Sequence, residues 1–282
     1  MHRWSWVAAA VASAALAAGG ATTASASAEP HSNQGGGRML AAPAPSGVTP
    51  AAGGAKELFS FNWSGYAQST SAGGTFTAAK DFWTVPAVTA GSGKQYSADW
   101  VGIDGFGNAK LVQDGTEADN INGTAVYRAW TEILPASAVV ISGLAIHPGD
   151  RVEGLVQEIS ANTWQMTVFD LTTGKSGGRT VGYTAKGTSV EAIHERPQVN
   201  RSLAALAKTG PVTFDPGSYS TAAPGSTSFK PLLSAASGAT LNEIFMVNNA
   251  GNAVIASPSP ADSDSDGFTV ADGPTSPPPP GS

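Results

Sequence analysis

Short runs in which apolar and polar side chains alternate recur along the middle of the chain. The clearest is W-Q-M-T-V-F-D-L at residues 164–171. Successive side chains of a strand point to opposite faces, so this period of two predicts a strand with one buried face. Further apolar or alternating runs lie at 98–103, 125–133, 139–146, 151–159 and 241–247. Gly, Pro, Asn and Asp separate the runs, as at 148–150, 173–175 and 248–251. Strands spaced by roughly 10–12 residues predict an all-β sandwich or barrel, and only residues 202–208 are expected to be helical.

The two ends of the chain differ in composition from this middle block. His2 and Arg3, an apolar run at 7–18 and the sequence A-S-A at 26–28 predict a signal peptide over residues 1–28. The apolar run is shorter than the roughly 20 residues of a membrane helix. Residues 29–60 are rich in Gly, Ala, Pro and Ser and are expected to be a disordered leader or propeptide. Residues 61–256 form the expected domain, and the Pro- and Ser-rich residues 257–282 are expected to be a flexible tail.

Composition excludes several classes of function. The chain has no cysteine, which rules out a thiol nucleophile, a Cys-ligated zinc and an iron–sulfur cluster. Its net charge is −6 and Lys and Arg do not cluster, so nucleic acid is not expected as a partner. The absence of a G-x-S-x-G motif argues against a serine hydrolase of the α/β type.

Metal ligands are scarce as well. Two of the four histidines lie in the predicted signal peptide and leader, which leaves only His147 and His194. One acidic segment resembles the first half of a calcium loop, because its residues Asp262, Asp264, Asp266 and Gly267 have the spacing of loop positions one, three, five and six. Position twelve of such a loop requires a bidentate Glu but is glycine here, which favours a solvated acidic tail. No cofactor and no metal are therefore expected.

Two carboxylates and one amide remain as candidates for chemistry. The strand predicted at 190–195 places Glu191 and Glu195 on one face, with Cα atoms about 13 Å apart. That distance is too long for the pair of carboxyl groups of a retaining glycosidase, which stand about 5 Å apart. Gln113 precedes a Gly turn, and its amide can donate hydrogen bonds without titrating, as an oxyanion stabiliser in acid must. From local sequence alone, the more common interpretation of each of these three side chains is an ordinary exposed polar group.

A series of motifs, taken in order, resembles the eqolisin family of glutamic peptidases, as a cysteine-free member of bacterial type. The motifs are N-W-S-G at 62–65, W-T-V-P at 83–86, W-V-G-I-D-G at 100–105, L-V-Q-D-G at 111–115, Y-R-A-W-T-E-I-L-P at 127–135, V-E-A-I-H-E-R-P at 190–197 and I-F-M-V-N at 244–248. The resemblance covers residues 61–256. It implies a two-sheet antiparallel β-sandwich of the concanavalin A-like jelly-roll type, which agrees with the predicted strands.

The resemblance also implies roles for individual residues. The catalytic pair of the family falls on Gln113 and Glu195. Substrate-binding or supporting positions that line or adjoin the cleft fall on Trp63, Trp100, Asp104, Glu117, Trp130, Glu132 and Glu191. The sequence departs from the fungal pattern by lacking cysteines and by carrying Arg128 and Leu134 where acidic and aromatic residues are common. By alternation, His194 should point away from the cleft and be structural.

The expected function is therefore a secreted, pepstatin-insensitive acid endopeptidase that uses a Glu/Gln dyad, with no metal and no covalent intermediate. Its expected partners are protein or peptide substrates, with no nucleic acid and no stable membrane association after signal removal, and we expect a monomer. The leader is a candidate inhibitory propeptide, cut near residues 56–61. The alternative is a non-catalytic, lectin-like module that binds carbohydrate or peptide.

Overall fold

The computed structural model describes residues 36–46 and 54–281, so the predicted signal peptide lies outside the described residues. Within these ranges the chain forms strands, turns and bends, and no residue is helical. Accordingly, no helix in this part of the chain is long and apolar enough to cross a membrane. The all-β class predicted from the alternating pattern is confirmed.

One sheet has β13 (Ser189–Glu195) at its centre, paired with β3 on one side and β6 on the other. Its pairings are antiparallel except for that between β2 and β19, which is parallel. The strands follow in the order β1 (Ala41–Ala42), β2 (Lys56–Ser60), β19 (Thr240–Val247), β3 (Trp63–Ser69), β13, β6 (Ala98–Ile103), β7 (Val112–Ile121), β8 (Thr124–Ile133) and β9 (Val139–Val140), and β5 (Lys94–Gln95) also pairs with β7.

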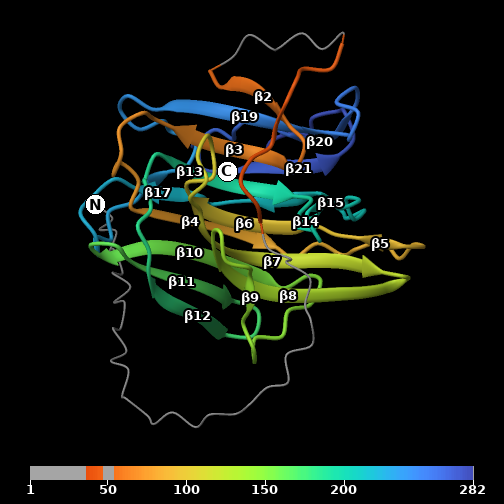
Figure 1. Ribbon diagram of the computed structural model, residues 1–282, viewed down its shortest axis with the longest axis horizontal. Coiled ribbons are helices and arrows are strands. Elements are labelled where there is room, and N and C mark those ends of the chain that lie inside the picture. The colour runs from red at the N-terminus through yellow and green to blue at the C-terminus, as the bar shows by residue number, and fades with distance from the viewer. Residues whose placement is uncertain (1–35, 47–53, 282) are drawn as a thin grey trace, which may run out of the picture. The chain divides into compact units, whose positions relative to one another are not determined.

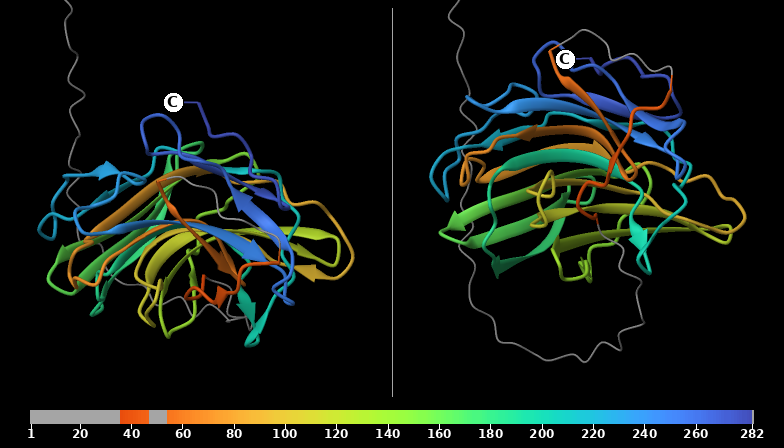
Figure 2. Two further views of the ribbon diagram at one scale, coloured as in Figure 1. Left: turned by 90° about the horizontal axis from the view of Figure 1, so that it is seen from above. Right: turned by 45° about the horizontal axis from the view of Figure 1, so that its top comes forward.

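A second set of strands is built on β4 (Ala78–Thr84) and β10 (Arg151–Ser160). β11 (Thr163–Asp170) and β12 (Lys175–Gly182) continue it beyond β10. On the other side of β4 lie β16 (Val212–Phe214), β17 (Ser218–Ser220), β18 (Lys230–Pro231), β21 (Phe268–Asp272) and β20 (Val254–Pro258). The two sets are joined where β20 pairs with β19, and the ribbon views show their strands curving together (Figures 1 and 2).

The main hydrophobic core lies between the two sets of strands. On β11, Trp164, Met166 and Val168 are buried at every second position, as the period of two predicted. They belong to one cluster with residues of β13 such as Val190 and Ala192, whose side chains alternate with those of Glu191 and Glu195. Burial of this apolar surface is the main source of stability in a chain without disulfides. The odd-numbered side chains of β13 are thereby left for the opposite face of the sheet.

The structure corrects the expected helix at residues 202–208. Gln198–Val199 (β14) and Ser202–Leu203 (β15) pair instead as a short hairpin. Its two turn residues, Asn200 and Arg201, have φ angles of 52° and 66°, the left-handed values that a two-residue hairpin turn requires. Backbone pairing with neighbouring segments therefore overrides the weak local preference of a short helical pattern.

The structure also corrects both domain boundaries. Residues 56–60, which we assigned to a disordered leader, form β2 and pair with β1 and β19. Residues 257–282 are not simply a flexible tail, because β21 pairs with β16 and β20 and Phe268 is fully buried. The Gly-, Ser- and Pro-rich segments around them concealed these short strands, each of which gains its stability from partners distant in the sequence. Of the run predicted at 139–146, only β9 is a strand.

Candidate active site

Gln113 and Glu195 lie on different strands and face the same point. The register β13–β6–β7 places Glu195 opposite Ala98 and Gln113 opposite Gly102. A Cβ atom added to Gly36 would lie 2.5 Å from Gln113 Oε1 and 2.8 Å from Glu195 Oε2. The two side chains that the family resemblance paired are thus brought together by the sheet.

The carboxyl group of Glu195 accepts hydrogen bonds from three directions. Asn62 Nδ2 donates at 2.8 Å, Trp100 Nε1 at 2.9 Å and the backbone N–H of Gly37 at 2.9 Å to Oε1. Glu195 is fully buried, and burial raises its pKa well above the ordinary value, whereas these three donors oppose the rise and nearby Glu132 adds to it. The carboxyl group is therefore held in one orientation and readily carries a proton.

Asn62 is a site residue that sequence reasoning missed. It immediately precedes β3, whose first residue, Trp63, is opposite Glu195 in the register. Its Nδ2 contacts Glu195 and its Oδ1 accepts from the backbone N–H of Leu40 at 2.8 Å. The only signal was its place in the N-W-S-G motif, because a single Asn before a strand is usually an ordinary turn residue.

The side chain of Gln113 is held by a second acid. Its Nε2 donates to Glu132 Oε2 at 2.7 Å and to the carbonyl oxygen of Gly36 at 2.7 Å. Both neighbours accept, so the atom between them must be the NH₂ group, which establishes the orientation of the amide. Burial raises the pKa of Glu132 to about 8, and the hydrogen bond from Gln113 opposes that shift. Glu132 lies opposite Gln113 on β8 and supports the donor.

Three tryptophans form the floor beneath the pair. Trp63, Trp100 and Trp130 are each fully buried, in a cluster that also contains Leu111 and Ile193. Trp63 Nε1 donates to the carbonyl oxygen of Gly37 at 2.7 Å. Its ring meets that of Trp100 edge-on, with centroids 5.0 Å apart. This apolar floor keeps water away from the polar groups above it, which strengthens their interactions.

The other acids predicted for the site make their contacts elsewhere. Asp104 accepts from the backbone N–H groups of residues 186–188 at 2.5–3.1 Å and so fastens that loop. Glu117 pairs with Arg128, one of the departures from the fungal pattern. Glu191 is fully buried four residues before Glu195, and burial raises its pKa well above normal. The structure therefore does not bring these three acids to Gln113 and Glu195.

His194 points away from the site, as alternation predicted. Its Nδ1 lies 2.7 Å from Asp99 Oδ1, and both side chains are buried. Burial acts to lower the pKa of His194, but the charge and hydrogen bond of Asp99, with a smaller effect from Asp272, together raise it above the ordinary value. The histidine is structural.

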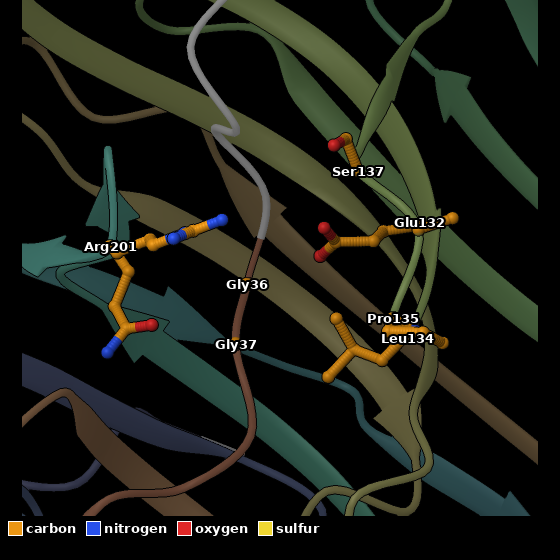
Figure 3. Close-up of a pocket in the computed structure, with 9 residues that line it drawn as sticks. Gly36, Gly37, Glu132, Leu134, Pro135, Ser137 and Arg201 are labelled. Carbon is orange, nitrogen blue, oxygen red and sulfur yellow. The ribbon is translucent and has the colours of Figure 1, made fainter.

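Residues 36–37 run through a cleft beside the pair. Figure 3 shows Glu132, Leu134, Pro135 and Ser137 on one side of this segment and Arg201 on the other. Leu134, the second departure from the fungal pattern, therefore lines the cleft wall. Gly36 and Gly37 themselves line this cleft and lie between its two sides.

A family model described as the Peptidase A4 family matches residues 61–266, which is more than half of the chain. The chain belongs to this family, the eqolisins. The assignment decides between the two functions considered above: the protein is a peptide hydrolase and not a non-catalytic lectin-like module. A comparison with curated proteins finds no match for the sequence.

Solved structures similar to this eqolisin share its β-sandwich jelly roll. Scytalido-glutamic peptidase with a transition-state analogue inhibitor aligns with a TM-score of 0.60 and 23% identity, over 75% of this chain and 98% of the other. SCP-B, a member of the eqolisin family in complex with the tripeptide Ala-Ile-His, aligns at 0.56 and 21% identity, over 75% and 98%. Aspergilloglutamic peptidase from Aspergillus niger aligns at 0.53 and 27% identity, over 63% and 99%. The two-sheet sandwich predicted from the sequence is confirmed.

Proposed function

We propose that this eqolisin is an acid endopeptidase in which Glu195 is the general acid and base and Gln113 stabilises the oxyanion. One observation carries the proposal: the peptide bond between Gly36 and Gly37 lies across the two side chains. Its carbonyl oxygen accepts from Gln113 Nε2, and its N–H group donates to Glu195. These are the two ends of a peptide group that hydrolysis must act on.

The geometry supports a direct attack by water. Glu195 as a carboxylate takes a proton from a water molecule, which adds to the carbonyl carbon of the bound peptide. Gln113 donates to the oxygen as it becomes negatively charged. Glu195 then passes the proton to the nitrogen, and the C–N bond breaks to release an amine and a carboxylic acid. A single carboxyl group handles both transfers because Gln113 has no proton to lose, and neither a metal nor a covalent intermediate is required.

Three further residues support this chemistry as positioning groups. Asn62 and Trp100 orient the carboxyl group of Glu195, and Glu132 holds the amide of Gln113. A donor that is already aimed at the developing charge needs no reorganisation during the reaction. Glu195 must act first as a carboxylate and then as an acid toward nitrogen, and the hydrogen bonds from Gly37, Asn62 and Trp100 favour its carboxylate form against the effect of burial on its pKa.

The test is hydrolysis of denatured casein from about pH 2 to about pH 8 with pepstatin present, in which we expect this peptidase to remain active. Glu195→Gln should abolish turnover, and Gln113→Ala should lower the rate by roughly 10²–10³. Glu158→Gln is the matched control, because Glu158 binds the backbone of Asn162 in a distant turn. Full activity of the Glu195→Gln variant would refute the assignment, as would a loss below about threefold for Gln113→Ala.

We also propose that the leader inhibits the peptidase until it is cut. Besides the two glycines, Arg38 O accepts from Asn62 Nδ2 at 3.1 Å and Met39 N donates to Gly105 O at 3.1 Å. The leader thus occupies the position that a substrate needs. A cut near residues 56–61, our first expectation, would fall in β2, which is paired on both sides. The contacts instead support the Gly36–Gly37 bond as the one that the dyad cuts in its own chain.

Intact-mass measurement and N-terminal sequencing of the full chain test this part of the proposal. Active protein should begin at Gly37, whereas Glu195→Gln should keep the leader. An active protein that begins at Glu29 would refute both the inhibition and the cut. Cutting at Gly37 in the Glu195→Gln variant would show that another peptidase makes the cut and would leave the dyad assignment intact.

The location and oligomeric state of the protein are the last part of the proposal. The signal-like composition of residues 1–28 supports secretion into the extracellular space. We expect protein or peptide substrates, no nucleic acid, no stable membrane association and a monomer. Recovery of the protein from culture medium and its elution volume on size exclusion would check these expectations, and retention in the membrane fraction would contradict them.

A further inference from the structure

An acidic loop between β20 and β21 resembles the first half of a calcium loop. Asp262, Asp264 and Asp266 stand at positions one, three and five, and Gly267 follows at position six. Position twelve, where the calcium loop has its Glu, is Gly273. From the sequence alone this missing ligand favours a solvated tail.

The loop is a closed turn between two paired strands, and Figure 1 shows β20 and β21 side by side. Asp262 N donates to Gly267 O at 3.0 Å, and Asp266 N donates to Asp262 Oδ1 at 3.1 Å. Ser265 adopts a left-handed φ of 64°. Phe268, the next residue after the loop, is fully buried in the core. The carboxyl groups are therefore held in place by the strands on either side.

A further acid reaches this loop from a distant part of the chain. Asp215 lies between β16 and β17. One carboxylate oxygen from each of Asp215, Asp262 and Asp266 lies within 4.8 Å of the others. Calcium binds oxygens at about 2.3–2.6 Å, so two of its ligands are at most about 5 Å apart. The spacing of the three oxygens is therefore compatible with ligands of one ion, and Asp215 brings a carboxylate from outside the loop, where position twelve has none.

Independent evidence for a ligand comes from Asp262. Its Oδ2 has no hydrogen-bond partner among the described residues, although only 7% of the residue is exposed. This oxygen faces Asp215: a Cβ atom added to Gly267 would lie 2.3 Å from Asp262 Oδ2 and 3.0 Å from Asp215 Cγ. A buried acceptor without a partner is costly, and a bound cation removes that cost.

Behind the three acids lies a second buried carboxyl group. Asp81, on β4, is fully buried, and its Oδ2 likewise has no partner in the part of the chain that the structure describes. A Cβ atom added to Gly217 would lie 2.3 Å from this oxygen and 3.0 Å from the backbone oxygen of Asp266. Asp81 is thus next to the loop and presents, within the described residues, a further carboxyl oxygen without a partner on its inner side.

Arg151 lies close enough to act on the charge of Asp215, but within the described ranges it forms no ion pair with the cluster. Arg151 Nη2 donates to the backbone oxygen of Asp215 at 2.6 Å and not to its carboxylate. None of the ion pairs within the described ranges includes these acids. The carboxyl groups of Asp215, Asp262 and Asp266 carry like charges when ionised and repel one another at these short separations. A divalent cation would relieve that repulsion.

We propose that Asp215, Asp262 and Asp266 bind a calcium ion. The ligands are all oxygens, which suit a hard cation and do not suit zinc or copper. Calcium tolerates irregular coordination at six to eight oxygens, whereas magnesium demands a near-ideal octahedron. The ion ties the β16–β17 turn to the loop before β21. It thus stabilises the C-terminal strands in a chain that has no disulfide, and it takes no part in hydrolysis.

The test uses the full chain carrying Glu195→Gln, so that hydrolysis cannot complicate the melting curves. After treatment with a chelator, calcium chloride is titrated calorimetrically at about pH 7, with magnesium chloride as the comparison. Thermal unfolding is then followed with and without about 5 mM calcium chloride. We expect saturable heat with calcium and a rise in Tm of about 5 °C, which Asp262→Asn and Asp215→Asn each abolish. Glu158→Gln, which removes the same charge elsewhere, should keep the full rise.

Each variant is compared with itself in the presence and absence of calcium, so a change in its basal stability does not decide the result. If one variant fails to fold, the other and the calorimetric titration of the parent protein still test the site. Absence of both heat and a rise in Tm in the parent would overturn the proposal. An equal rise in the parent and in both Asp→Asn variants would also overturn it.

Discussion

The raised pKa of Glu132 predicts how the free energy of unfolding changes with pH. Only 4% of this residue is exposed, and burial raises its pKa to about 8. In the unfolded chain a Glu titrates near about 4.3. Between these values the folded state binds a proton that the unfolded state has lost. The contribution of this bound proton to the stability of the fold is therefore fully present below about pH 4 and is lost as the pH rises toward 8.

The size of the effect follows from the shift. Each unit of pKa difference corresponds to about 1.36 kcal/mol, so the free energy of unfolding should fall by on the order of 4 kcal/mol between about pH 4 and about pH 8 from this group alone. Replacing Glu132 by Gln removes the titration but keeps an oxygen that can accept from Gln113 Nε2. The variant should therefore lose much less stability over the same range.

Urea unfolding of the Glu195→Gln protein, with and without Glu132→Gln, measures this difference. The common background keeps the leader in place in both proteins. Glu158→Gln serves as the control and should leave the dependence on pH unchanged. Identical dependence on pH with and without Glu132 would refute the reasoning, because it would mean that the carboxyl group titrates alike in the folded and unfolded states.

Three further substitutions test the packing and the positioning groups. Trp100→Phe removes the hydrogen bond from Trp100 Nε1 to Glu195 and should lower kcat by roughly tenfold with little change in KM. Steady-state kinetics measures both constants, and a change in KM alone would contradict the prediction. Gly115→Ala should destabilise the fold by about 1–3 kcal/mol in urea unfolding, since its Cβ would lie 2.6 Å from Trp100 Cβ, and unchanged stability would count against this tight packing. Thr116→Val removes the acceptor of the buried Trp83 Nε1–H and should lower the free energy of unfolding by about 1–3 kcal/mol. Unchanged thermal unfolding of this variant would contradict the prediction.

Local pattern was enough to predict the class of the fold and most of its strands. The run at 98–103 coincides with β6, and those at 151–159 and 163–171 fall within a residue or so of β10 and β11. Alternation also predicted correctly that His194 faces away from Glu195. These features depend on side chains a few residues apart, whose directions a strand determines by itself.

Local pattern failed where a strand or a site depends on distant partners. β2 and β21 are short runs within segments of linker-like composition, and both are strands because neighbours from elsewhere in the chain satisfy their backbone groups. The hairpin at 198–203 replaced an expected helix for the same reason. Backbone hydrogen bonds between segments contribute nothing to the local sequence signal.

The candidate sites show the same division. The family resemblance identified Gln113 and Glu195, but only the register β13–β6–β7 brings them together, with Asn62 delivered beside them at the start of β3. In the acidic loop, the sequence determined the spacing of Asp262 and Asp266, and the fold supplied Asp215 from another turn. The sequence by itself thus determined which side chains are available and which face of a strand each occupies. The tertiary structure alone decided which of them meet, because that depends on the pairing of strands far apart in the chain.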